Sequence, residues 1–594
     1  MKANPKSAKI VRWRFYGVLS ALFALLISLV WHLASIQILP NESQGYKFLQ
    51  HQGLVRTLRS ESIPALRGVI TDRHGEPLAV STPVVSLWAH PKELQSDKEN
   101  LPALVKSLNL TLGDLKDKLQ RFRDKEFMYL RRHLTPADAE KVLALQIRGV
   151  YAQREYRRFY PAGEVAAHLV GFTNIDDSGQ EGLELAYDQW LTGENGKKQV
   201  LKDLRGRVFK DVNLISAAKA GKDIALSIDL RLQYLAYKEL KEAVKAHRAK
   251  SGSVVLLDAK TGEVLAMANQ PSYNPNDRRG IKASMLRNRA MTDQFEPGST
   301  MKPLTVMAAL ETGRFKPSTQ IDTHPGHLRV GRKTLLDPVN YGVMDVAKIL
   351  QKSSQVGLTK ISLGLEGETI RDMFFRAGLG QDTGTGFPGE STGLLPNYAK
   401  WQPIVQANFS FGYGVSLTAL QLAQAYSVIA NDGVKKPVSL LKLAGAQQSD
   451  VVVSPGIAKQ VATMLQKVVE PGGTGTRANI EAYQVAGKTG TIHKVGRQGY
   501  ADDRYLSLFA GFAPASDPRL IAVVAINEPS SGQYFGGEVA APVFSALVER
   551  GLRLMQVPPV TASQSISSQQ TKVVKKVKPS AKPLQNTPVQ EPVT

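Results

Sequence analysis

The sequence predicts an α+β protein with a single membrane-spanning helix at its N-terminus. Three observations carry this prediction. An apolar run without Lys, Arg, Asp or Glu covers residues 15–39. Residues 67–81 and 251–270 each read as a β-hairpin, with apolar runs on both sides of a turn. Two further strand-like runs in residues 505–529 precede a helical pattern, and this mixture of strands and helices favours an antiparallel sheet packed with helices.

The composition excludes several classes of function. The chain has 594 residues, no cysteine and a formal net charge of +23. Disulfides, thiolate catalysis and cysteine-ligated zinc are therefore excluded. The positive charge indicates attraction to something anionic, such as lipid headgroups. We expect no nucleic-acid partner, because no zinc-finger spacing or RNA-binding aromatic motif is present.

The apolar run is long enough to cross a bilayer, which takes roughly 20 residues. Residues 1–14 contain five Lys or Arg and no acid, so the positive-inside rule leaves this basic segment in the cytoplasm and the rest of the chain outside. The alternative is a cleaved signal peptide, whose apolar region is shorter, roughly 7–15 residues, and ends at small residues. This run ends in "SIQILPNE". We therefore predict an uncleaved anchor at residues 15–39.

Three further regions follow the anchor. Residues 40–222 are mixed and irregular, with one clear helix signal where Thr135 caps "PADAEKVLAL". Residues 223–555 hold the hairpin at 251–270, a helical cluster, the later strands and the last helix. Residues 556–594 are rich in Ser, Gln, Pro, Val and Lys, which predicts a disordered basic tail.

One short stretch, "FEPGSTMKPLT", places Ser299 three residues before Lys302 at an expected helix start. The Ser-x-x-Lys pattern is weak by itself, since the chain contains three of them, at Ser216, Ser299 and Ser439. Ser299 is either a helix cap or a nucleophile. Positions i and i+3 share a helix face, so the Lys302 amine is expected near the Ser299 hydroxyl. A lysine can act as the base for a serine hydroxyl only where burial or nearby cations keep the lysine amine neutral.

Two later elements complete a pattern. Ser353-Ser354-Gln355 lies 54 residues after Ser299, and Lys488-Thr489-Gly490-Thr491 follows further on. Gly487-Lys488-Thr489 resembles the end of a phosphate-binding loop, but Ala482 stands where that motif needs glycine. A second Lys-Thr-Gly, at residues 260–262, falls at the tip of the expected hairpin and reads as a turn.

The three elements in this order resemble the penicillin-binding protein and serine β-lactamase superfamily. "RGVITDRHGEPLAVS" and "RRFYPAGEVAAHLVGFTNIDDSGQEGLELAYD" resemble the pedestal module of class B penicillin-binding proteins. "AGLGQDTGTGFPGESTGLLP" and "FGYGVSLTALQLAQAYSVIANDGV" resemble their transpeptidase domain. The resemblance covers roughly residues 10–555 and is nearest to the septal D,D-transpeptidases of Gram-negative bacteria. Gln355 departs from the family, which has Asn there, and its side chain is one methylene longer.

The resemblance implies a serine acyltransferase acting on stem peptides that end in D-Ala-D-Ala. Its catalytic residues are Ser299 as nucleophile, Lys302 as base, Ser353 as proton relay and Lys488 as a neighbouring positive charge. β-Lactams are expected to acylate Ser299 and remain attached.

The resemblance also implies the binding residues. Thr489, Gly490 and Thr491 hold the terminal carboxylate, and Gln355 contacts the donor peptide. The backbone N–H groups of Ser299 and Thr491 form the oxyanion hole. No metal or cofactor is implied, and two histidines in a Pro-Gly turn, His324 and His327, read as a loop.

The implied place of action is the inner membrane at the division septum, with the catalytic domain in the periplasm. The implied partners are a SEDS-family (FtsW-like) glycan polymerase and other divisome proteins, bound by the anchor and residues 40–222. Two alternatives stay open: the same chemistry in the elongation complex, and a catalytically silent divisome scaffold in which Gln355 has broken the site.

Overall fold

The computed structural model describes residues 12–38, 46–202, 208–445, 447–496 and 499–559. The predicted basic segment as far as residue 11 and the predicted tail from residue 560 lie outside these ranges. The chain forms two compact units, each made of separate stretches. The first comprises residues 1–67, 82–157 and 192–221, and the second comprises residues 68–81, 158–191 and 222–594.

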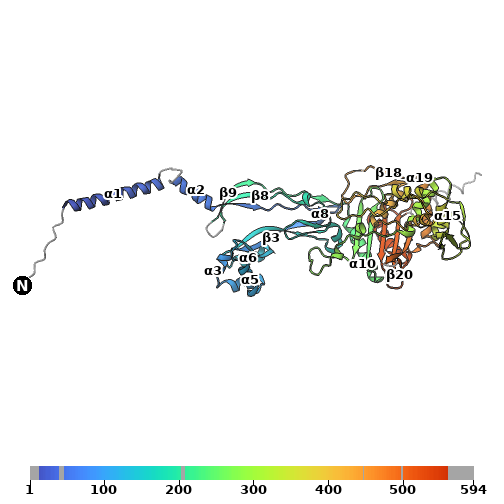
Figure 1. Cartoon of the computed structure of the whole chain (residues 1–594), viewed down its shortest axis with the longest axis horizontal. Coiled ribbons are helices and arrows are strands. Elements are labelled where there is room, and N and C mark those ends of the chain that lie inside the picture. The colour runs from blue at the N-terminus through green and yellow to red at the C-terminus, as the bar shows by residue number, and fades with distance from the viewer. Residues whose placement is uncertain (1–11, 39–45, 203–207, 446, 497–498, 560–594) are drawn as a thin grey trace, which may run out of the picture. The chain divides into compact units, whose positions relative to one another are not determined.

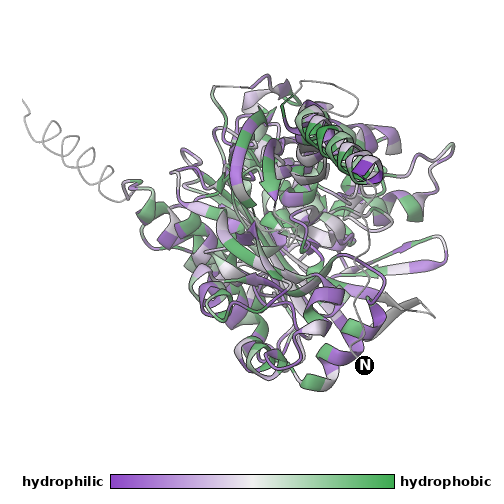
Figure 2. Cartoon of the chain, turned by 90° about the vertical axis from the view of Figure 1, so that its left-hand side faces the viewer, coloured by the Kyte–Doolittle hydropathy of each residue, from purple (hydrophilic) through white to green (hydrophobic). Residues whose placement is uncertain are grey.

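The first unit begins with the helix α1, Arg12–Gln37, which is long and apolar enough to cross a membrane. Figure 2 shows α1 as a mostly hydrophobic helix. Its large apolar side chains are exposed, for example Phe23 at 63% and Leu25 at 67%. Because such a surface is stable only in an apolar surrounding, α1 has the properties of a membrane anchor.

The rest of the first unit is a three-stranded antiparallel sheet and a small helical layer. The sheet has the order β1-β8-β9, from Leu58–Ile63, Gly196–Lys202 and Val208–Ser216. The helical layer packs on the later part of β3 and on its partner β4 around buried leucines. The elements outside this three-stranded sheet are α2 (Tyr46–Thr57), which contacts β8, and then β3 (Pro77–Ala89), α3 (Pro91–Ser96), α4 (Leu101–Leu108), α5 (Leu112–Arg121), β4 (Met128–Leu134), α6 (Pro136–Leu143) and β5 (Val150–Phe159). Thr135 caps α6 as predicted, accepting from the Asp138 N–H.

In the second unit, residues 68–81 and 158–191 pack with the large C-terminal part of the chain. The predicted hairpin at 67–81 is confirmed, with β2, Ile70–Thr71, antiparallel to the start of β3. β10, Ile224–Ala225, adds to β2 on its other side. The short elements here are α7 (Ala167–Val170), β6 (Phe172–Thr173), β7 (Gly179–Glu181), α8 (Gly182–Ala186) and α9 (Asp188–Leu191).

A five-stranded antiparallel sheet forms the centre of the second unit (Figure 1). Its order is β12-β11-β21-β20-β19, from Val264–Gln270, Ser251–Asp258, Leu520–Asn527, Gly499–Ala513 and Ala486–Gly496. The predicted hairpin at 251–270 and the predicted strand pair near residues 505–529 are therefore confirmed. The sequence prediction of an antiparallel sheet packed with helices is correct.

Helices cover both faces of this sheet, so alternate residues of each strand enter different cores. Val254 and Leu256 of β11 pack with α10, Leu230–Ala246, and α21, Ala541–Leu554. Val255 and Leu257 face the opposite core, which contains α13, Lys302–Glu311, α18, Ala419–Ala430, and α19, Pro455–Val469. Burial on both faces explains the near-continuous apolar runs of these strands.

The remaining elements of the second unit extend these cores or lie at their surface. They are α11 (Ala283–Leu286), α12 (Arg289–Thr292), β13 (Gln320–Asp322), β14 (His327–Val330), β15 (Lys333–Leu336), β16 (Val343–Asp345), α14 (Val346–Lys352), α15 (Gln355–Leu363), α16 (Gly367–Arg376), α17 (Pro403–Ser410), β17 (Val434–Lys435), β18 (Asp450–Val451) and α20 (Gly536–Val539).

Candidate active site

Ser299 lies in a tight turn that leads into α13. The turn is a 3-10 helix, Gly298–Met301, and α13 begins only at Lys302. The predicted helix start at Ser299 is therefore wrong by one turn, and no side-chain capping hydrogen bond forms at either helix start. The Lys302 N–H donates to the Ser299 carbonyl, so the backbone fixes the two residues relative to each other.

Glycine is required just before Ser299. Gly298 has φ +55°, in the left-handed region that favours glycine, and a Cβ there would lie 2.6 Å from Cγ1 of Ile492. A Cβ on Gly490 would lie 3.3 Å from the carbonyl oxygen of Pro297. The absence of side chains at these two glycines lets the Ser299 turn pack directly on β19.

Two fully buried lysines meet at one serine hydroxyl. The Nζ of Lys302 lies 3.2 Å from Ser353 Oγ, and the Nζ of Lys488 lies 3.0 Å from the same oxygen. Lys302 also donates to the backbone carbonyl of Ser353 at 2.5 Å, and Lys488 donates to that of Thr489 at 3.2 Å. Helix α13, the end of α14 and strand β19 each supply one member of this cluster.

Burial sets the charge of the two amines. It lowers the pKa of Lys302 to about 7, while the nearby Asp337 carboxylate acts in the opposite direction. Burial also holds the pKa of Lys488 well below its usual value, and the neighbouring Lys302 amine lowers it further. Near neutral pH these lysine amines are therefore partly unprotonated and can accept a proton.

A buried carboxylate organises the segment that carries Ser353. Asp337 Oδ1 accepts the backbone N–H groups of Gln355, at 2.6 Å, and Val356, at 3.2 Å. Its other oxygen accepts the Ser354 hydroxyl, which in turn accepts the Gly357 N–H and so caps α15. Sequence reasoning missed Asp337, because the only local signal is a lone Asp before Pro338.

Ser353 itself ends α14 in a left-handed conformation with φ 58°, and this turn places its hydroxyl and carbonyl toward Lys302. Gln355 is half-buried at the first position of α15 and is fixed through its backbone by Asp337. Its side chain is the departure from the family pattern noted in the sequence.

The threonines of β19 have polar neighbours that the sequence did not indicate. Thr489 Oγ1 lies 2.8 Å from Thr474 Oγ1, and Thr491 Oγ1 accepts the Gly536 N–H at 2.9 Å. Both hydroxyls are thereby oriented by segments distant in sequence. The structure thus brings Lys302, Ser353 and Lys488 into hydrogen-bond contact, beside the Ser299 turn and the Thr489–Thr491 stretch.

The described residues contain no group of three His, Cys, Asp or Glu side chains that could hold a metal ion. His324 lies in the turn between β13 and β14, as predicted, with its Nδ1 2.7 Å from Asp322 Oδ1, whereas His327 begins strand β14 and not a loop. The Lys-Thr-Gly at residues 260–262 occupies the turn between β11 and β12, as predicted.

Comparison with known families defines the class of protein. The penicillin binding protein transpeptidase domain family matches residues 252–549, and the penicillin-binding protein dimerisation domain family matches residues 62–226. The chain has both domains, and its Lys302, Ser353 and Lys488 meet beside strand β19. These features define a penicillin-binding transpeptidase.

Individual relatives place the chain within that class. It is 41% identical over 563 residues to the peptidoglycan D,D-transpeptidase FtsI of Escherichia coli, covering 94% of each chain. It is 44% identical over 514 residues to the probable peptidoglycan D,D-transpeptidase PbpC of Pseudomonas aeruginosa, covering 86% of this chain and 91% of the relative. The chain belongs to the FtsI, or penicillin-binding protein 3, family of peptidoglycan D,D-transpeptidases.

Solved structures agree with this assignment. Penicillin-binding protein 3 of Mycobacterium tuberculosis, complexed with aztreonam, is 30% identical with a TM-score of 0.65, covering 84% of this chain and 98% of the other. The transpeptidase domain of Burkholderia pseudomallei penicillin-binding protein 3 is 42% identical with a TM-score of 0.52, covering 56% and 97%.

Proposed function

We propose that this protein cross-links peptidoglycan stem peptides through an acyl-enzyme on Ser299. The observation that carries the proposal is the Ser353 hydroxyl held between the two buried amines of Lys302 and Lys488, beside the Ser299 turn. A serine hydroxyl is a weak nucleophile at its ordinary pKa and needs a nearby base. Burial makes Lys302 suitable, because an amine with a pKa of about 7 is half neutral at neutral pH.

In the proposed acylation, Lys302 takes the hydroxyl proton of Ser299 while the Ser299 oxygen attacks the carbonyl carbon of the donor's penultimate D-alanine. Ser353 passes a proton to the departing D-alanine amine, and its position between both lysines supports this role. Lys488 keeps the relay oriented. The neutral peptide bond breaks, D-alanine leaves with the proton, and an ester to Ser299 remains.

The β19 segment is proposed to bind the end of the donor. The hydroxyls of Thr489 and Thr491, with Gly490 between them, hold the terminal carboxylate. The N–H groups of Ser299 and Thr491 bind the oxygen that becomes negative, a contribution of about 3 kcal/mol for each donor. Gly490 supports this role, because it lets the turn that precedes Ser299 approach β19.

Gln355 is proposed to contact the donor peptide amide in the place of the family asparagine. It has the same donors and acceptors on a longer side chain. We therefore expect Gln355→Asn to change β-lactam and donor affinity while leaving Ser299 reactive. Comparing acylation by benzylpenicillin in both proteins separates this from loss of function.

In the second half of the reaction an amine of a neighbouring stem peptide attacks the ester carbonyl, with Lys302 taking a proton from the amine. The new amide bond is the cross-link; the ester bond to Ser299 breaks, and Lys302 returns a proton to the Ser299 oxygen. The side chains named above account for both steps without a metal or organic cofactor. A strained β-lactam is expected to acylate Ser299 and to stay attached.

We propose that α1 anchors the protein in the inner membrane with its N-terminus in the cytoplasm and its catalytic domain in the periplasm. The basic residues before α1 support this orientation. The proposed place of action is the division septum, with a SEDS-family (FtsW-like) glycan polymerase and other divisome proteins as partners. The likeness to FtsI of Escherichia coli favours division over elongation.

The direct test is labelling of the membrane fraction with fluorescent penicillin. We expect one labelled band of about the chain's 64.8 kDa, absent in Ser299→Ala, and mass spectrometry that places the adduct on Ser299. An unlabelled wild-type band would instead support the silent scaffold. Imaging of the tagged protein distinguishes the two cellular roles, since septal bands indicate division and patches on the lateral wall indicate elongation.

A further inference from the structure

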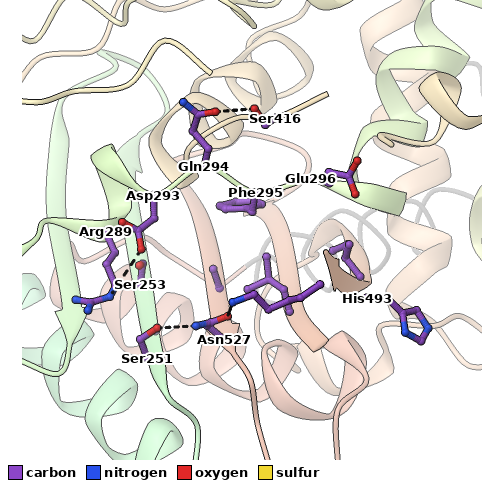
Figure 3. A pocket seen from close by; sticks show the side chains of 15 residues that line it. Ser251, Ser253, Arg289, Asp293, Gln294, Phe295, Glu296, Ser416, His493 and Asn527 are labelled. Atoms are coloured by element: carbon purple, nitrogen blue, oxygen red, sulfur yellow. Dashed lines mark hydrogen bonds and ion pairs between the residues drawn. The ribbon is translucent and has the colours of Figure 1, made fainter. Parts of the chain in front are cut away.

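A groove of about 900 Å³ lies in the second unit, away from the proposed active site. The cavity that has Phe295 and Glu296 in its wall is part of the active site (Figure 3), and it shares no residue with this groove. The groove is lined by the turn between β2 and β3, by residues 161–165 and by the first turns of α10. Leu554, the last residue of α21, also lines it.

Apolar side chains make up most of the groove surface. Tyr234 is 57% exposed and Leu554 is 40% exposed, although both are large apolar side chains. Pro161 is exposed beside them and Val165 is half-buried. Because exposed apolar side chains that gather on one surface mark a binding site, we expect this groove to have an occupant.

The charge left unmatched in the groove is negative. The Asp72 carboxylate already accepts backbone N–H groups, among them that of Leu230 at 3.1 Å. Arg231 is paired with Asp229 at 2.7 Å. The exposed carboxylate of Glu76, in contrast, has no hydrogen bond or ion pair among the described residues. An occupant with positive charge would therefore match this groove.

The C-terminal part of the chain starts from the groove. After Leu554 the described chain continues to Pro559, and the carbonyl of the buried Val557 accepts the Tyr483 hydroxyl at 2.7 Å. Residues 560–594 follow, outside the described ranges, and their sequence contains five lysines and a single acid. Four of these lysines and three valines form the run "KVVKKVK" at residues 572–578, called here the basic segment.

The basic segment is close enough along the chain to reach the groove. Lys572 follows Pro559 by 13 residues. An extended chain of that length spans up to about 45 Å, which is more than the groove requires. A short tether gives an effective concentration on the order of 1 mM, so a segment with a Kd of about 1 mM as a separate peptide would be bound half of the time.

We propose that the basic segment binds in this groove of its own molecule. Its valines cover Tyr234 and Leu554, and one of its lysines pairs with Glu76. The tail then joins the β2–β3 turn, α10 and α21, which come from three distant parts of the chain. The groove and its occupant are thus an intramolecular contact separate from the transpeptidase chemistry.

The test uses cysteine pairs, because the chain has no cysteine of its own. The full-length protein in detergent carries Tyr234→Cys together with Val574→Cys and is oxidised at low protein concentration. Two cysteines link only when their Cα atoms come within about 7 Å. We expect an intramolecular disulfide, identified by mass spectrometry of the linked peptides.

The matched control pairs Tyr234→Cys with Ser567→Cys. Ser567 lies nearer to Pro559 than Val574 does and outside the basic segment, so random encounter would link it at least as fast. We expect the Val574 pair to link at least about tenfold faster than the Ser567 pair, because only the basic segment is held in the groove. An unchanged Tm shows that each variant is folded.

A charge reversal tests the role of Glu76. Glu76→Lys should slow linking of the Tyr234 and Val574 cysteines by about two- to fivefold, the range for an exposed ion pair. The control Glu242→Lys makes the same change at a 64% exposed residue of α10 that does not line the groove, and it should leave the rate unchanged.

Four outcomes overturn the inference. The first is equal linking of the Val574 and Ser567 pairs, and the second is equal slowing by Glu76→Lys and Glu242→Lys. The third is a disulfide that forms only between molecules, which would make a second copy the occupant. The fourth is loss of linking when the protein is placed in phosphatidylglycerol vesicles, which would assign the lysines to an anionic lipid surface.

Discussion

The acylation rate is expected to rise with pH through the titration of Lys302. Burial lowers its pKa to about 7, and only the neutral amine can accept the Ser299 proton. With that value about 3% of Lys302 is neutral at pH 5.5 and about 97% at pH 8.5. Benzylpenicillin acylation, followed by stopped flow, should therefore accelerate about 30-fold over this range with a midpoint near 7. A rate that is flat or falls with pH would refute Lys302 as the base.

The Asp337 carboxylate provides a directional check on the same reasoning. Its negative charge favours protonated Lys302, so Asp337→Asn should move the midpoint of the acylation profile to lower pH. Asparagine keeps an oxygen for the N–H groups of Gln355 and Val356, which preserves the local backbone.

The matched control for this variant is Asp345→Asn. Asp345 caps α14 by accepting the Lys348 N–H at 2.7 Å, and asparagine is an equally good cap. Its profile should coincide with that of the wild type. A midpoint that moves upward in Asp337→Asn, or that moves equally in both variants, would show that the Asp337 charge does not act on Lys302.

Three further predictions concern stability. Burial lowers the pKa of Lys302 in the folded state, so the unfolded chain binds the proton more readily. The resulting loss of stability grows as the pH falls from 10.5 to about 7 and is constant below that. Between pH 8.5 and 6 the wild-type protein should lose about 2 kcal/mol of unfolding free energy relative to Lys302→Met, measured by urea unfolding. A parallel pH dependence in both proteins would contradict this. Gly298→Ala should slow acylation and lower Tm, because the alanine Cβ would lie 2.6 Å from Ile492 and the backbone φ at this position is +55°. An acylation rate and a Tm equal to those of the wild type would show that the turn adapts freely. Arg158→Ala should cost about 3–5 kcal/mol, because it removes the guanidinium that lies 2.6 Å from the fully buried Glu184 carboxylate. A loss below about 1 kcal/mol by urea unfolding would be inconsistent with a strong buried pair.

The local features of this fold were predictable from the sequence. The apolar run predicted the helix that became α1, and the turn residues between apolar runs predicted the hairpin β11–β12. Thr135 predicted the start of α6, because a cap is a hydrogen bond between residues three apart. The start of α13 was misplaced, since a 3-10 turn and an α-helix have the same local preferences.

Only the tertiary structure decided how the site is assembled. The sequence supplied Ser299, Lys302, Ser353 and Lys488 as motifs, but nothing local showed that one hydroxyl would lie between two buried amines. Nothing local indicated Asp337 either, because its carboxylate accepts the N–H of Gln355, which lies 18 residues further along the chain at the start of α15.

The sequence by itself thus determined several local elements, namely the apolar helix α1, the hairpins and the start of α6, and through its ordered motifs the family. Those properties depend on neighbours within a few positions of the chain. The register of β19 against β20, that of β20 against β21, and the burial that lowers the pKa of Lys302 depend on packing between distant segments. Their energies arise from desolvation and close approach, which exist only once the sheet and its helices have come together.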